Sequence, residues 1–262
     1  IARVESDRGE FLGLGFYSRE SQIRVRLLEG ETAWRGVEFF TDRVVAALRL
    51  RRRVIGPDTT GYRLLNAEGD GVPGWTVDRF GDVLVSQITS AGLDRMRGEA
   101  YAAVARLLPE CSVLQSNDLA ARRLEGLGLE DQEVAGQPPR VAAFTENGLL
   151  LEADLASGQK TGYYCDQREN RLLAARLAPA ARVLDLFAHS GGFALLAARH
   201  GAAGVMAVDS SQAALDRLEA QARLNQLSGI EPRRADVFEF LRQAEGEVAA
   251  RAAQVVVAGV VV

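Results

Sequence analysis

Three acidic residues end or follow short apolar runs in the last third of the chain. Asp185 lies near the end of one run, Asp209 ends the next, and Asp236 follows a third. In a parallel β–α–β arrangement the carboxyl ends of successive strands meet at one edge of the sheet, where ligands bind. A carboxylate at that edge can accept hydrogen bonds from ribose hydroxyls. The three acids therefore predict a site for a nucleoside-containing cofactor.

A Ser-Gly-Gly turn separates the first apolar run from a helical pattern. Gly191 and Gly192 would let the backbone approach a ligand closely, because neither has a Cβ atom. Leu195 occupies the third-glycine position of the dinucleotide fingerprint, and no Gly-Lys-Ser/Thr of a P-loop follows. These absences argue against dinucleotides and nucleoside triphosphates.

S-adenosylmethionine is the cofactor that fits what remains. Asp185 would lie near its cationic end, Asp209 at the ribose and Asp236 at the adenine amino group. The alternative is an α/β core whose strand-end acids only cap helices.

Composition limits the classes of protein. The chain has 262 residues, 47% of them hydrophobic, and a net charge of −4, which argues against non-specific coating of nucleic acid. No apolar run approaches the length needed to span a membrane. Cys111 and Cys165 lack metal-ligand spacing, so we expect no metal and a reduced, cytoplasmic protein.

Hydrophobic periodicity divides the chain into four parts. Strand-like alternation comes first, then a helical period, then mixed α+β patterns with one long helix at 91–108, and finally alternating strands and helices. Asn117 and Asp118 are expected to cap a short helix. The predicted parts are 1–30, a linking helix at 31–54, a central α+β domain at 55–156 and a Rossmann-like α/β domain at 157–262.

The predicted linking helix ends in a basic run, Arg49 to Arg53. The favoured interpretation is a solvated helix end whose cations complement the macrodipole. A patch that contacts phosphate is the alternative.

A polar segment at 157–171 immediately precedes the Rossmann-like core. Such polarity favours a cofactor lid or substrate loop over a solvated interdomain turn. The residues that we expect to act there are Lys160, Tyr163, Asp166, Arg168 and Asn170.

Four motifs resemble one family across nearly the whole chain. They are AEGDGVPGWTVDRFGD (67–82), SGQKTGYYCDQRENR (157–171), VLDLFAHSGGFAL (183–195) and AVDSSQAALDRLEAQARLN (207–225). Together they are similar to the bacterial PUA-linked class I methyltransferases that form 5-methylcytosine in 23S ribosomal RNA with S-adenosylmethionine.

The resemblance implies a partial PUA-like RNA-binding domain at 1–30 and a class I methyltransferase domain after the central domain. It also implies ribosomal RNA as the partner, and it leaves the oligomeric state open, a homodimer included. The cofactor-binding residues it implies are Asp185, Phe187, His189, Ser190, Gly191, Gly192, Asp209, Ser210 and Asp236.

The chain departs from the family pattern in two places. His189 stands where relatives usually carry Tyr, and we expect it to form loop hydrogen bonds rather than act as a base. The family's Asp-Pro-Pro acid is replaced by the run 257–260, and its cysteine nucleophile is not in this sequence. We therefore expect that the chain is cut at both ends and that its catalytic residues stay unknown. Cys165 is expected to be a structural cysteine. The alternatives are a guanine-N or small-molecule methyltransferase and a non-catalytic RNA-binding relative.

Overall fold

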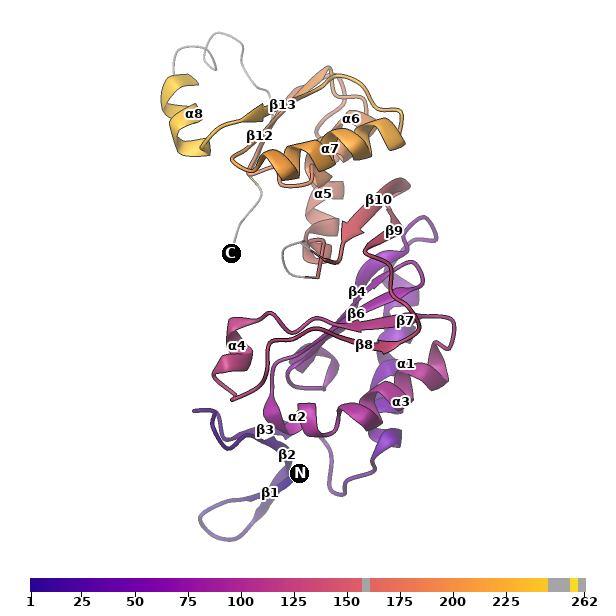
Figure 1. Cartoon of the computed structure of the whole chain (residues 1–262), viewed down its shortest axis with the longest axis vertical. Coiled ribbons are helices and arrows are strands. Elements are labelled where there is room, and N and C mark those ends of the chain that lie inside the picture. The colour runs from indigo at the N-terminus through magenta and orange to yellow at the C-terminus, as the bar shows by residue number, and fades with distance from the viewer. Residues whose placement is uncertain (157–160, 245–254, 259–262) are drawn as a thin grey trace. The chain divides into compact units, whose positions relative to one another are not determined.

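A computed structural model describes residues 1–156, 161–244 and 255–258, with side chains described through residue 243 (Figure 1). The chain forms two compact units: the first comprises Ile1–Phe144 and Ala153–Cys165, the second Thr145–Glu152 and Asp166–Val262. Among the described residues, no helix is both long enough and apolar enough to cross a membrane.

The first unit begins with an antiparallel sheet of β1 (Ala2–Glu5), β2 (Phe11–Tyr17) and β3 (Val25–Leu28), as the alternation predicts. Helix α1 (Val37–Val54) follows. Phe16 of β2 packs on Phe39 and Phe40 of α1, and Trp34 joins them with ring centroids 5.4 to 6.2 Å away. The predicted linking helix is therefore part of a core that the N-terminal sheet shares.

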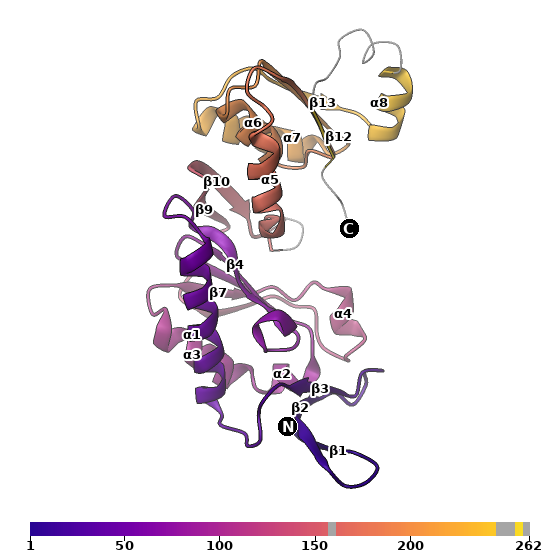
Figure 2. The same cartoon turned by 180° about the vertical axis from the view of Figure 1, so that it is seen from behind.

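A five-stranded sheet forms the body of this unit. Its order is β4 (Gly61–Asn66), β5 (Trp75–Phe80), β6 (Val83–Ile88), β7 (Ser112–Gln115) and β8 (Gln132–Ala135), and a 3₁₀ turn spans Ala67–Asp70. Only the β6–β7 pair is parallel. Helices α1 and α3 (Arg97–Leu107) pack against each other, and both contribute to the core of this sheet (Figures 1 and 2). The α+β prediction is confirmed.

Two local expectations were wrong. The helix expected at 91–108 is divided into α2 (Ala91–Arg95) and α3 by Met96, whose N–H donates to Leu93 in a tighter turn. Helix α4 (Ala120–Arg123) begins after Leu119 without a side-chain cap. Asn117 binds Gln115 and the backbone of Glu130 instead, because tertiary partners compete with the local cap.

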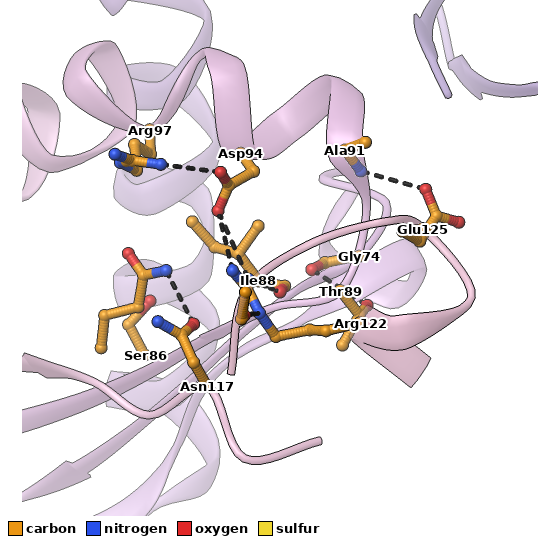
Figure 3. A network of polar contacts seen from close by, with 12 residues as sticks. Gly74, Ser86, Ile88, Thr89, Ala91, Asp94, Arg97, Asn117, Arg122 and Glu125 are labelled. Atoms are coloured by element: carbon orange, nitrogen blue, oxygen red, sulfur yellow. Dashed lines mark hydrogen bonds and ion pairs between the residues drawn. The ribbon is translucent and has the colours of Figure 1, made fainter. Parts of the chain in front are cut away.

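The break before α3 leaves Asp94 facing a buried arginine (Figure 3). The Arg122 guanidinium donates to the carbonyl oxygens of Gly128 and Ile88 at 2.7 and 2.5 Å, and to Asp94 at 3.3 Å. Asp94 also accepts a 2.7 Å bond from Arg97. Buried charges are tolerated when they are paired in this way, so we interpret the cluster as scaffold.

The boundary between the units passes through the hairpin of β9 (Val141–Glu146) and β10 (Leu149–Asp154), and its tip, Thr145–Glu152, belongs to the second unit. After a 3₁₀ turn at Cys165–Gln167 come α5 (Arg168–Ala175), β11 (Arg182–Leu186), α6 (Gly192–Arg199), β12 (Gly204–Asp209), α7 (Gln212–Leu224), β13 (Ile230–Arg234), α8 (Val237–Ala244) and β14 (Val255–Ala258). The four strands from β11 onward form a parallel sheet in the order β13-β12-β11-β14. This is the predicted Rossmann-like topology, and β14 is its fourth strand.

Alternating residues of the central strands face opposite layers. Val183, Val205 and Ala207 belong to a cluster with residues of α6 and α7, whereas Leu184 and Val208 pack in a cluster with residues of α8. Helix α7 starts after Ser211, whose hydroxyl accepts the N–H of Ala214 at 3.3 Å. The hairpin docks on the end of α7, where the Asn225 amide forms bonds of 2.8 and 2.7 Å with the backbone of Leu150. The sheet thus has a helical layer on each face.

Candidate cofactor site

The loop between β11 and α6 has an unusual backbone. Phe187, His189 and Gly191 have φ values of 56, 49 and 80°. Two of the three carry a side chain in the left-handed region, and such conformations persist where the surroundings impose them. A Cβ on Gly191 would come within 2.4 Å of Leu218. Close packing on α7 therefore requires this glycine, and the close approach of a ligand to its backbone stays a prediction.

Asp185 lies wholly inside the sheet, with 0% of its surface exposed. Its Oδ2 accepts the N–H of Ala194 at 3.0 Å, in the first turn of α6. Its Oδ1 is buried and accepts no hydrogen bond from the residues described. Burial raises the pKa of this carboxyl to about 7, while the Ala194 bond and the charge of Arg171 oppose the rise. An acceptor left open at the carboxyl end of a strand is what a cationic or hydrogen-bonding ligand can satisfy.

Asp209 links the tip of β12 to the same loop. Its Oδ2 accepts the N–H of His189 and its Oδ1 that of Ser211, each at 2.8 Å. A carboxylate has about four acceptor positions, so both oxygens retain capacity for a ligand. The charge of Asp209 contributes to the raised pKa of Asp185, so the two carboxylates lie close enough to interact. The predicted convergence of these two acids is present.

His189 is partly buried, and burial lowers its pKa, which favours the neutral ring. Its Nδ1 lies 3.2 Å from the Ser190 hydroxyl. The Ser190 carbonyl in turn accepts a 3.1 Å bond from Gln221 of α7. This environment is consistent with the expected hydrogen-bonding role of His189.

Asp236 is exposed and caps α8, because its carboxylate accepts the N–H of Glu239 at 2.9 Å. The contact that Asp236 makes in the structure is thus the helix cap named as the alternative. A role of Asp236 in binding the adenine amino group stays a prediction. Sequence reasoning missed Phe238, two residues later, which is 63% exposed and packs edge-on against Phe187 at 5.8 Å. The signal available in the sequence was an aromatic residue two positions after a predicted strand-end acid.

Two further predicted residues occupy the loop ends. Gly192 is the first residue of α6. Ser210 is exposed, and its carbonyl accepts a 3.3 Å bond from Arg234. The backbone of Gly192 thus lies at the end of the loop after β11, and that of Ser210 directly follows β12.

The expected lid residues are divided between the two units, and their action as a group stays a prediction. Lys160 lies outside the described residues. Tyr163 belongs to the first unit, where its ring is 2% exposed and lies 5.0 Å from that of Phe144, which favours a structural role. The other three, Asp166, Arg168 and Asn170, lie at the start of α5 in the second unit.

Arg168 and Asn170 make local contacts. Arg168 pairs with Glu169 at 2.6 Å, and Asn170 donates to Gln167 at 3.0 Å. Asp166 is exposed. Their action on a ligand stays a prediction.

A buried ion pair close to Asp185 also escaped sequence reasoning. Arg171 of α5 binds both carboxylate oxygens of Glu146 at 2.7 and 2.9 Å, and both side chains are almost fully buried. The guanidinium lies 5.9 Å from the ring centre of Phe193, the residue before Ala194. Arg171 therefore connects the hairpin to α6, the helix in which the N–H of Ala194 binds Asp185.

Comparison with known proteins places these features in a family context. Residues 129–234 match a family described as S-adenosylmethionine-dependent methyltransferase, and residues 1–29 match a PUA-like domain. Proteins named ribosomal RNA large subunit methyltransferase I are similar: that of Photobacterium profundum is 40% identical over 245 residues and that of Serratia proteamaculans 42% over 246. These matches cover 92% and 91% of this chain but 62% of each relative. The chain thus spans about 62% of the length of the curated relatives it matches.

Two solved structures resemble the chain over most of its length. A Streptococcus mutans protein described as a SAM-dependent methyltransferase superposes with a TM-score of 0.80 at 25% identity. A methyltransferase complexed with SAH superposes with a TM-score of 0.81, also at 25% identity. Each match covers 94% of this chain and 64% of the other. The fold is therefore that of a Rossmann-like S-adenosylmethionine methyltransferase domain preceded by a PUA-like β domain.

Proposed function

We propose that this chain is the cofactor- and RNA-binding part of an S-adenosylmethionine-dependent RNA methyltransferase, with cytosine C5 of 23S ribosomal RNA as its target. The observation that carries the proposal is the open Oδ1 of Asp185 beside Asp209, at the tips of β11 and β12. The relatives named ribosomal RNA large subunit methyltransferase I support the RNA class of substrate.

The chain's own residues fit the cofactor. Asp185 would face its cationic methionine end, and the remaining acceptor positions of Asp209 would take ribose hydroxyls. Asp236 would accept the adenine amino group, and Phe187 with Phe238 would offer apolar ring surface beside it. Bound S-adenosylmethionine supplies an electrophilic methyl group. The protein would then position that methyl in line with the acceptor atom.

Cytosine C5 requires a nucleophile at C6, since it reacts poorly until the ring's aromaticity is broken. Cys111 and Cys165 are both buried, and burial raises the pKa of the Cys111 thiol to about 11. Neither environment favours an accessible thiolate. Support for cytosine C5 therefore comes from the family resemblance, whereas the site itself supports methyl transfer from this cofactor.

The first test is calorimetric titration of the chain with S-adenosylmethionine and with S-adenosylhomocysteine. We expect both to bind at one site, because the strand-tip acids contact parts that the two share. NADH and ATP serve as matched controls and should not bind. Failure of both sulfur nucleosides to bind would refute the proposal.

The second test identifies the methylated atom. Incubation of the full-length protein with 23S ribosomal RNA, followed by nuclease digestion and mass spectrometry, should yield 5-methylcytidine. A methylated guanine amine would replace the cytosine assignment, and methylation of small molecules alone would replace the RNA assignment. Cofactor binding without methyl transfer to any of these would favour the non-catalytic relative.

A further inference from the structure

The last turns of α1 carry three arginines on the side of the helix opposite the core. Arg49, Arg52 and Arg53 are exposed, and none has a carboxylate within ion-pair distance among the residues that the structure describes. Their spacing of three and four places them on one helical face. We call these three residues the α1 arginine face.

The neighbouring Arg51 has a different environment. Its guanidinium binds both carboxylate oxygens of Asp70 at 2.6 and 2.7 Å and the carbonyl of Arg63 at 3.0 Å. It points toward the sheet, as expected for a residue on the buried side. The fold itself thus supplies Arg51 with acceptors, and among the described residues it supplies no carboxylate to the other three.

Other arginines in or near this helix have acidic partners. Arg35 pairs with Asp42, and Arg43 pairs with Glu31. Like charges three and four residues apart repel each other, so three unpaired arginines on one face have an electrostatic cost that an anion would relieve. The chain as a whole carries a net charge of −4, which makes this a local basic surface on an acidic protein.

We propose that the α1 arginine face binds the phosphate backbone of the RNA on which the methyltransferase acts. This inference rests on the proposed function, and it assigns the contact to the first unit, whereas the cofactor residues belong to the second. Guanidinium groups suit phosphate because their donors match two of its oxygens. Contacts of this kind position RNA without reading its sequence. Leu50 and Val54 lie beside the face and are 50% and 59% exposed, so a protein partner is the competing occupant.

The test compares two triple variants with equal loss of charge. The first is Arg49→Gln/Arg52→Gln/Arg53→Gln. The second, Arg95→Gln/Arg123→Gln/Arg140→Gln, removes exposed arginines of the first unit that lie on three separate segments and likewise have no described ion-pair partner. Thermal unfolding should show that both variants fold.

The measurement is the affinity for 23S ribosomal RNA fragments at several salt concentrations. Each phosphate contact contributes about 0.7 to 0.9 to the slope of log K against log salt. The face variant should lose about two slope units and at least about tenfold in affinity near 0.1 M salt, because several contacts disappear together. The control should change by less than about threefold. An equal loss in the two variants, or no loss in the first, would overturn the inference.

Cofactor titration separates this inference from the proposed function. Both variants should bind S-adenosylmethionine as the wild type does, because the substitutions leave the second unit unchanged. If the wild type binds cofactor but its RNA affinity is insensitive to the face variant, the inference fails and the proposed function stands. If the face variant instead abolishes self-association in sedimentation while RNA affinity persists, the surface is a protein contact and the inference is wrong.

Discussion

Arg122 of the first unit and Asp185 of the second are both buried ionisable side chains, but their surroundings differ. The Arg122 guanidinium donates to two carbonyls and to Asp94. Asp185 accepts one backbone N–H, and its second oxygen has no hydrogen-bond partner among the residues described. The first group is satisfied by the fold, whereas the second is left for something outside it. Buried charge alone does not mark a functional site, whereas an open acceptor at the carboxyl end of a strand makes Asp185 a candidate for one.

Removal of the Arg122 guanidinium should have the largest effect. Arg122→Met leaves the carbonyls of Ile88 and Gly128 without their donor and weakens the pairing of Asp94. We expect the free energy of unfolding to fall by about 3 to 5 kcal/mol. Denaturant titration measures this, with exposed Arg123→Met as control, which should stay within about 0.5 kcal/mol of wild type. A loss below about 1 kcal/mol would mean that the cluster is not the scaffold we infer.

Asp185→Asn tests the unsatisfied buried group through the pH dependence of the free energy of unfolding. The folded-state pKa of Asp185 is raised to about 7 from 3.8, so between these values the folded state keeps a proton that the unfolded state has released. The stability contributed by the protonated carboxyl is thus full below pH 4 and declines as pH rises to about 7. Relative to Asp185→Asn, wild type should lose on the order of 3 kcal/mol across this window. Exposed Asp216→Asn is the control, and parallel pH profiles for wild type and Asp185→Asn would contradict the buried environment.

Glu146→Gln examines a satisfied pair within the second unit. The amide can still accept one bond from Arg171, but the buried guanidinium loses its counter-charge, so we expect a loss of about 2 kcal/mol in unfolding free energy. Glu169→Gln, which breaks the more exposed pair with Arg168, should cost at most about 1 kcal/mol. Equal effects in chemical denaturation would show that burial does not distinguish the two pairs.

Asp209→Ala tests the comparison through ligand binding rather than through folding. Loss of the carboxylate removes acceptors for the ribose, and hydrogen bonds to a charged group contribute about 1.5 to 3 kcal/mol. We therefore expect the dissociation constant of S-adenosylmethionine to rise about 10- to 100-fold. Calorimetry measures the change, with Asp216→Ala on the exposed side of α7 as control. Retained affinity would count against the ribose assignment.

Sequence reasoning predicted what depends on local pattern. Helical periodicity predicted α1, and strand-like alternation predicted the N-terminal antiparallel sheet. The break at Met96 could not be predicted, because it depends on tertiary contacts around Asp94. The side chain of Asn117 likewise follows distant partners rather than the nearby helix.

The candidate site shows the same limit. Asp185 and Asp209 were found because strand ends and glycine turns leave a local signature. The pair of Arg171 with Glu146 was not, since a hairpin brings together residues that lie far apart in sequence. The packing of Gly191 against Leu218 also depends on a helix that the local pattern does not place.

The open oxygen of Asp185 also bears on how the protein is maintained in a cell. A ligand that binds only the folded state raises its stability by mass action, and an unmet acceptor makes the ligand-free state comparatively costly. On the proposed function, a shortage of cofactor would enlarge the unfolded fraction on which proteases act. The supply of cofactor would then influence the amount of folded protein as well as its rate of methyl transfer.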